Sequence, residues 1–339
     1  MSQKLNNQWL QPTIKPMKVI LDSDAYNESD DQFEITWALC HEDRLSIQAF
    51  YAAPFLNGRS KSPEDGMNKS YDEIKKLLSL AGMTNKYPVY HGSTNFIEHE
   101  HYVDSEAVDD LIHRCGKLAV DERIYVVATG ALTNIASAIL KEPQLIDKLV
   151  VIWLGGQALY WTSAFEFNLS EDRFAANTVL NSKVPFILTP AMGVASNLCT
   201  TQYEINHYLA NTSDSGNYLA QETTDYLNKI DREGDAGLSK LTHEPDPYLR
   251  GMTDLDTENF PATTAVIARS KVIWDLAPLA FLINPRWTTS KLVSAPIINA
   301  DDTWQLTSNR HLIRVITHVD RDGIFGDLFY QISQLPRTK

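Results

Sequence analysis

Short runs of β-branched and aromatic residues alternate along this chain with longer segments of helical periodicity, and this alternation limits the possible folds most strongly. Between the runs, apolar residues are spaced as on one face of a helix. Strands that alternate with helices form a mostly parallel sheet with helices on both faces. The sequence therefore predicts an α/β fold with a largely doubly wound sheet. The six expected strands cover residues 17–22, 46–53, 87–92, 123–130, 148–156 and 184–190.

The second half of the chain departs from this alternation. Residues 196–282 look more helical, and within them residues 231–262 form a polar stretch that contains glycine and proline. This stretch could be a disordered linker, but we interpret it as a loop or lid over a site, because it is about thirty residues long and lies inside a compact chain. The apolar runs KLVSAPII and HLIRVITHV predict a small terminal strand pair. All of these segments are expected to form a single domain over residues 1–339.

The stretch DSDAYNESDD, residues 22–31, places four aspartates and one glutamate directly after the first expected strand. One aspartate at a helix start is explained by capping of free backbone N–H groups. Four exceed that need, since like charges a few ångströms apart raise one another's pKa. A hard cation such as calcium, with about six to eight oxygen ligands, resolves the conflict. Zinc is disfavoured because no thiolate or histidine pair is nearby, and a solvated acidic loop is the alternative.

Three further residues point to the same region. Asn57 and Thr129 also follow expected strand ends, and open parallel sheets bind ligands beyond the carboxyl ends of their strands. Asp275 stands in an apolar segment, between Trp274 and Leu276. A buried carboxylate without a partner is costly, so a metal ion or a cation is expected beside Asp275.

Four stretches resemble, in the same order, the motifs of nucleoside hydrolases of the inosine/uridine-preferring type. DSDAYNESDD resembles their DxDxxxDD signature, and VATGALTNIASAI resembles PTGPLTNIA. WLGG followed by EFNLSEDRFAAN resembles MGG followed by AEFNxxxDPEAA, and IWDLAPLA resembles HDPLA. The resemblance covers residues 17–330, as in a distant member. It implies a nucleoside-hydrolase-like fold and a calcium-dependent N-ribosyl hydrolase of nucleoside salvage that releases ribose and free base.

The resemblance also implies roles for individual residues. Calcium would be bound by Asp24, Asp31, Asp275 and the backbone carbonyl of Thr129. Asp24 would also be the base that activates a calcium-bound water, and Asp22 would orient the others. The sugar hydroxyls would be bound by Asp30, Asn57, Glu166 and Asn168. These roles suit the reaction, because carboxylates stabilise the oxocarbenium-like state through which an N-glycosidic bond breaks.

Simpler explanations exist for several of these residues. Glu166 and Asn168 could lie on a solvated loop. Asn57 could be a turn residue before Gly58, and Thr129 could cap a helix.

The first acidic loop differs from the family pattern. Two extra residues separate Asp24 from Asp30, and AYNES replaces the usual Pro-Gly turn. Asn27 or Glu28 could therefore join the metal ligands.

The base pocket differs as well. Trp274 stands where pyrimidine-tolerant members carry a histidine, and it resembles the purine-preferring branch, in which an indole stacks on the base. A purine preference follows, unless Trp274 simply packs in the core. The acid that protonates the leaving base could come from His99, His101 or His243.

Composition limits the kinds of molecule that this protein is expected to bind. The chain has 30 basic and 43 acidic residues, a net charge of −13, which disfavours nucleic acids and anionic membranes. Cys40, Cys115 and Cys199 form no CxxC pair, which suggests a reducing compartment, and we expect them to be buried as small apolar residues. No signal peptide or membrane-spanning run is visible. We expect a cytoplasmic protein with a nucleoside as its small-molecule partner and, by resemblance, a homo-oligomer (a dimer or tetramer).

Two other functions compete with this interpretation. A phosphohydrolase of the haloacid dehalogenase type also begins with a strand and DxD, and there Asp22 would be the nucleophile and Asp24 the acid/base, with magnesium. Such enzymes need a later acidic pair, and no convincing GDxxxD segment is present. The second alternative is a non-catalytic homologue that binds a nucleoside or sugar.

Overall fold

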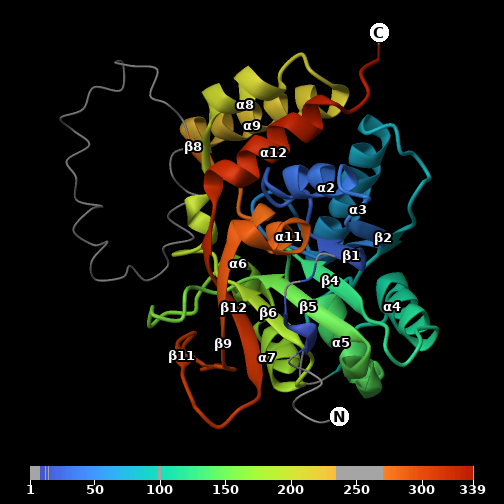
Figure 1. Cartoon of the computed structure of the whole chain (residues 1–339), viewed down its shortest axis with the longest axis vertical. Helices are drawn as coiled ribbons and strands as arrows, with labels where there is room; N and C mark the ends of the chain where they lie inside the picture. Colours follow the sequence, from blue (N-terminus) through green and yellow to red (C-terminus); the bar gives the residue numbers. More distant parts are fainter. Residues whose placement is uncertain (1–7, 12, 14, 98–100, 234–269, 339) are drawn as a thin grey trace, which may run out of the picture.

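The computed structural model describes residues 8–11, 13, 15–97, 101–233 and 270–338. Its centre is an eight-stranded sheet in the order β3-β2-β1-β4-β5-β6-β12-β9 (Figure 1). All neighbouring strands are parallel except β12 and β9. The predicted mostly parallel sheet is therefore confirmed. In sheet order the strands are β3 (Val89–His91), β2 (Leu45–Ala52), β1 (Met17–Ser23), β4 (Ile124–Ala128), β5 (Leu149–Leu154), β6 (Phe186–Thr189), β12 (Leu312–Val319) and β9 (Thr288–Ser294).

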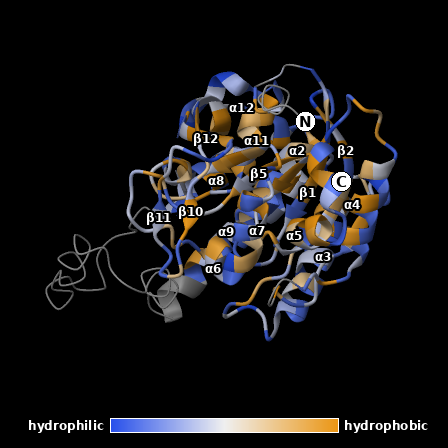
Figure 2. Ribbon diagram, turned by 90° about the horizontal axis from the view of Figure 1, so that it is seen from below, coloured by the Kyte–Doolittle hydropathy of each residue, from blue (hydrophilic) through white to orange (hydrophobic). Residues whose placement is uncertain are grey.

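Helices cover both faces of the sheet, as expected for a doubly wound fold. Side chains alternate between the faces of a strand, so Val19 and Leu21 of β1 join one hydrophobic cluster and Ile20 joins the other. Hydrophobic residues, orange in Figure 2, gather on central strands such as β5. One face carries α2 (Asp31–Leu39), α3 (Pro63–Leu80), α8 (Gln202–Leu209), α9 (Asp214–Glu233), α11 (Leu276–Ile283) and α12 (Arg321–Ser333). The other carries α4 (Glu106–Gly116), α5 (Thr133–Lys141), α6 (Phe167–Glu171) and α7 (Arg173–Asn181).

The second half of the chain contains structure that the sequence did not predict. The expected terminal strand pair is β9 and β12, and it extends the main sheet. A two-stranded antiparallel sheet of β7 (Cys199–Thr201) and β8 (Ser270–Val272) lies within the region expected to be helical. A second one joins β10 (Ile297–Ile298) to β11 (Trp304–Gln305). The helix α12 was not anticipated either.

Other expectations have different outcomes. The candidate lid, residues 231–262, lies outside the described residues apart from its first three positions, which end α9. The single-domain organisation stays a prediction. Cys115 is buried, but Cys199 is exposed, so the expectation of a buried residue is wrong there. Within the described ranges, no helix has the length and apolar character needed to cross a bilayer.

The direction of strand order reverses between β1 and β4. The chain passes from β1 outward to β2 and β3, and then from β4 outward to β5 and β6. At the carboxyl end of this pair, the Thr129 N–H donates to the carbonyl of Asp22 at 2.9 Å. A crevice at such a reversal is the usual ligand site of open α/β sheets.

Candidate active site

The acidic loop leaves β1 at this reversal and enters α2. Asp30 occupies the N-cap position of α2, yet its side chain makes no capping hydrogen bond. All nine residues of α2 are buried, so the acidic side chains of Asp31 and Glu34 lie inside the protein. Capping therefore does not explain why aspartates gather here.

Three aspartates from opposite ends of the chain meet at this point. Carboxylate oxygens of Asp30, Asp31 and Asp275 lie within 4.8 Å of one another, and all three residues are buried. Burial raises the pKa of Asp275 well above its ordinary value, and the charges of Asp30 and Asp31 raise it further. Burial likewise raises the pKa of Asp31 to about 7. Asp275 is held here because it immediately precedes α11, whose eight residues are all buried.

Asp24 adds a fourth carboxylate beside this cluster. Both of its side-chain oxygens are sealed from solvent and have no hydrogen-bond donor among the described residues. Burial raises its pKa well above the ordinary value, followed by the charges of Asp31 and Glu171. Buried polar groups without partners are rare in proteins.

These carboxylate ligands suit a hard cation. The clustered ligands are carboxylate oxygens, which suit calcium, whereas zinc prefers histidine and cysteine. A positive ion would also offset the repulsion among the buried carboxylates.

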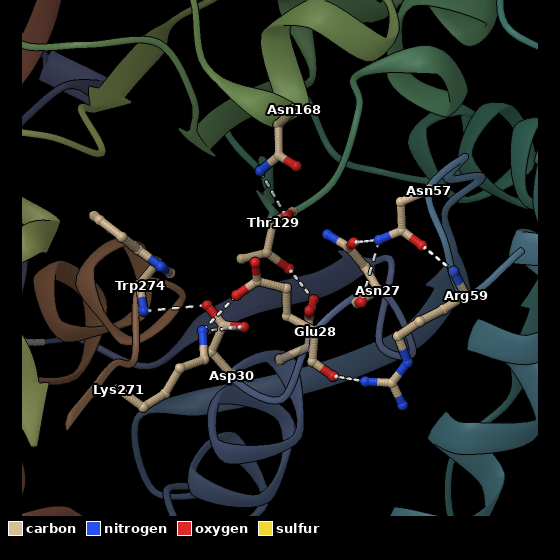
Figure 3. A network of polar contacts seen from close by, with 10 residues as sticks. Asn27, Glu28, Asp30, Asn57, Arg59, Thr129, Asn168, Lys271 and Trp274 are labelled. Carbon is tan, nitrogen blue, oxygen red and sulfur yellow. Dashed lines mark hydrogen bonds and ion pairs between the residues drawn. The ribbon is translucent and has the colours of Figure 1, made fainter. Parts of the chain in front are cut away.

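Hydrogen bonds fix the positions of the Asp31 carboxylate and the Thr129 carbonyl. The Ser23 hydroxyl donates to Oδ1 of Asp31 at 2.7 Å, and the Thr129 hydroxyl lies 3.1 Å from the same oxygen. Asn168 donates from Nδ2 to the carbonyl of Thr129 at 2.8 Å (Figure 3). Thr129 is thus no helix cap, since α5 begins after Leu132, and Asn168 is buried rather than solvated.

Glu166 is an N-cap residue. Its carboxylate accepts from the N–H groups of Asn168 and Leu169 in the first turn of α6, and from the N–H of Gly156 at 3.0 Å. Burial raises its pKa to about 7. Glu166 therefore does not lie on a solvated loop, and its carboxylate orients Asn168.

Asn57 is tied to the acidic loop. Its Nδ2 donates to the backbone carbonyl of Asn27 at 3.3 Å and to the Asn27 side chain (Figure 3). Its Oδ1 accepts from the N–H of Arg59 at 2.8 Å. The extra residues after Asp24 thus contact Asn57 through Asn27.

A lysine that sequence reasoning missed meets Asp30. Lys271 Nζ lies 3.4 Å from Oδ1 of Asp30 and contacts the carboxylate of Glu28 more closely. The N–H of Trp274 donates to the other Asp30 oxygen at 3.2 Å (Figure 3). The Trp274 side chain is half-buried and packs against the core.

Other missed residues are acidic. Glu34 lies near the Thr129 hydroxyl at 3.2 Å, and its position three residues after Asp31, on the same helix face, was a visible signal. Glu171 accepts from the Leu56 N–H at 2.5 Å. Of the suggested acids for the leaving base, His101 is exposed. His99 and His243 lie outside the described residues.

The sequence of the chain settles the family. The model of the inosine-uridine preferring nucleoside hydrolases matches residues 19–326. The chain belongs to this family. Nucleoside hydrolases of this family are metal-dependent and cleave the N-glycosidic bond of ribonucleosides, so the protein is an N-ribosyl hydrolase and not a phosphohydrolase.

Individual relatives are distant. A pyrimidine-specific ribonucleoside hydrolase, RihA of Citrobacter koseri, is 24% identical over 85% of this chain and 93% of its own length. Among solved structures, the plant nucleoside hydrolase PpNRh1 has a TM-score of 0.68 at 19% identity, with 94% of this chain and 99% of that chain covered. A purine-preferring ribonucleoside hydrolase from Gardnerella vaginalis has the same TM-score at 18% identity, with 93% and 98% covered. These structures establish the nucleoside-hydrolase-like fold.

Proposed function

We propose that this nucleoside hydrolase binds calcium through Asp24, Asp31, Asp275 and the Thr129 carbonyl, and that it cleaves purine ribonucleosides. The main support is the convergence of Asp31 and Asp275 with Asp30 within 4.8 Å. The two partnerless oxygens of Asp24 beside them supply further ligands.

Asp24 serves as the base in this proposal. When bound, calcium supplies positive charge that makes a neighbouring water easier to deprotonate. Asp24 would accept the proton of that water, because neither of its carboxylate oxygens has a hydrogen-bond partner among the described residues. Asp22 holds the strand end, since its Oδ1 accepts from Nδ2 of Asn134 at 2.9 Å.

The sugar is bound by residues around this centre. Vicinal ribose hydroxyls are donors and need nearby acceptors, which Asp30 and Glu166 supply as carboxylates. The Oδ1 atoms of Asn57 and Asn168 are the amide acceptors. Asn168 also orients the Thr129 carbonyl through its Nδ2.

Trp274 sets the base preference in this proposal. The curated relative quoted above is pyrimidine-specific, whereas one structural neighbour is purine-preferring, so the relatives do not decide between the bases. An indole next to Asp275 can stack on the larger purine, and such base–aromatic contacts contribute about 1–3 kcal/mol.

A nucleoside panel tests the proposal. Release of reducing sugar is measured for inosine, guanosine, adenosine, uridine and cytidine, with calcium and with a chelator. We expect sugar release from the purine nucleosides that stops in chelator and returns on addition of calcium. Unchanged turnover in chelator would overturn the calcium site. Calorimetric binding of inosine without any sugar release would favour the non-catalytic homologue.

The assembly and the location stay predictions. Sedimentation of the purified protein tests the expected dimer or tetramer, and a tagged copy in the cell tests the cytoplasm.

A further inference from the structure

Lys271 brings a positive charge into the interior of the acidic site. Its side chain is only 7% exposed, although it belongs to the short strand β8. The ammonium contacts the Glu28 carboxylate and lies 3.4 Å from Oδ1 of Asp30. It also stands 5.3 Å from the centre of the Tyr226 ring. Carboxylates and an aromatic face thus surround it.

Burial of the Lys271 ammonium costs free energy, and its charged partners offset that cost. Burial alone would lower the pKa of Lys271, but the charges of Asp30 and Glu28 raise the pKa above its ordinary value. A buried ammonium is tolerated only when it is well paired. Lys271 therefore stays charged, and its positive charge belongs to the acidic cluster.

Glu28 is itself held in place from a second side. Arg59 donates to the backbone carbonyl of Glu28 at 2.8 Å and to the Glu222 carboxylate at 3.1 Å. Its guanidinium also lies 4.3 Å from the centre of the Tyr26 ring. The acidic loop is thus fastened by two cations, and Glu28 points its carboxylate at Lys271 rather than joining the clustered aspartates.

We propose that Lys271 is a built-in counter-ion of the active site, which pairs with Asp30 and Glu28, offsets one of their two negative charges, and leaves Asp24, Asp31 and Asp275 to the calcium ion. The proposal rests on the proposed function and deepens it. Asp30, held by Lys271 and by the Trp274 N–H, is fixed toward the sugar before any ion binds. Lys271 acts through Asp30 and is a positioning residue.

The same geometry argues against Lys271 as a receptor for a substrate phosphate. An ammonium has three N–H donors, and Glu28 and Asp30 occupy two of them while the Tyr226 ring lies nearby. A phosphate would also enter a site rich in buried carboxylates. The structure therefore favours an uncharged sugar beside Asp30.

Calcium-dependent melting tests the proposal. The melting temperature is measured in chelator and in calcium for the parent, Lys271→Met, Glu28→Gln and the double variant. Lys271→Met leaves one more uncompensated negative charge, so we expect a lower melting temperature in chelator and a larger rise on adding calcium. Glu28→Gln removes a negative charge, so its rise should be smaller than that of the parent. The double variant, with the parent's charge balance, should show the parent's rise.

A surface lysine provides the control. Lys18 pairs with Glu122 at 2.8 Å, and both side chains are about 40% exposed, so Lys18→Met should leave the calcium-induced rise unchanged. Equal calcium-induced rises in all variants would overturn the proposal. If Lys271→Met does not fold in either condition, Glu28→Gln alone tests the proposal. A calcium-induced rise in its melting temperature as large as that of the parent would then overturn the proposal.

Kinetics separate this role from a merely structural one. With inosine, Lys271→Met should raise KM more than it lowers kcat, because Asp30 is misplaced before the sugar binds. An unchanged KM with a lower kcat would contradict positioning through Asp30. If no nucleoside is hydrolysed at all, the proposed function fails, while the melting experiment still decides the role of Lys271.

Discussion

Gly130 lies so close to Asp24 that a Cβ added to it would stand 3.2 Å from both Cβ and Cγ of Asp24. The same atom would lie 3.0 Å from Cβ of Ala53. The residue after Thr129 must therefore be small, because the end of β4 packs directly against the acidic loop.

Gly130→Ala should damage both stability and activity. We expect a loss of about 1–3 kcal/mol in the free energy of unfolding from overpacking, together with a lower kcat/KM as Asp24 is displaced. Urea denaturation and inosine kinetics measure the two effects. Gly116→Ala is the control, because nothing lies within 4 Å of its added Cβ. Parent-like behaviour of both variants would contradict this close packing.

Asp24→Asn should nearly abolish turnover while the fold stays intact. Loss of a general base lowers kcat by roughly 100- to 10,000-fold. In chelator the variant should melt higher than the parent, because a buried, partnerless carboxylate is removed. The calcium-induced rise in melting temperature should shrink. Asp72→Asn, an exposed change on α3, is the control, and parent-like turnover in Asp24→Asn would remove the mechanism.

Trp274→Leu should reduce the preference for purines. Loss of about 1–3 kcal/mol of stacking corresponds to a fall of about 5- to 150-fold in kcat/KM for inosine, with a smaller fall for uridine. Trp287→Leu is the matched control, since Trp287 stacks on Trp37 with ring centres 5.9 Å apart. It should lower stability without changing the inosine-to-uridine ratio. If Trp274→Leu leaves the inosine-to-uridine ratio of kcat/KM unchanged, Trp274 only packs in the core and does not bind the base.

Stability without calcium should fall as the pH rises. Burial raises the pKa of Glu171 to about 8, and its Oε2 has no partner among the described residues. The folded protein therefore keeps a proton that the unfolded chain loses above the ordinary carboxyl pKa. The free energy of unfolding should decrease between about pH 5 and pH 8, which urea denaturation in chelator measures. Glu171→Gln should make the slope shallower, while Asp31 and Glu166 keep part of it. A parent that gains stability over this range would contradict the argument.

The sheet and the acidic cluster could be predicted from sequence because their signals are local. Buried strands such as β4 and β5 are continuous apolar runs, and the aspartates of the first loop are neighbours in sequence. Thr129 was expected in this region because it follows a strand end, and Asp275 was expected beside a cation because it is flanked by apolar residues. Only their joint assignment to one calcium site came from the family resemblance. The roles assigned to these residues stay predictions.

The environment of Lys271 could not be predicted because its partners are distant in sequence. Glu28 precedes it by 243 positions, and the strand β8 exists only through its pairing with β7. Nothing in SKVIW distinguishes this lysine from a solvated one. The cap formed by Glu166 was missed for a related reason, since glutamate is not a typical N-cap residue.

The hydrogen bond from Trp274 to Asp30 joins residues 244 positions apart. During synthesis, a ribosome that has released β1 to β6 has exposed Asp24, Asp30 and Asp31 without Lys271 and Asp275. In the nascent chain, the repulsion among these aspartates stays uncompensated by Lys271 until the last fifth of the polypeptide emerges. We therefore expect ion capture to come late in biogenesis, as the step that seals a finished molecule.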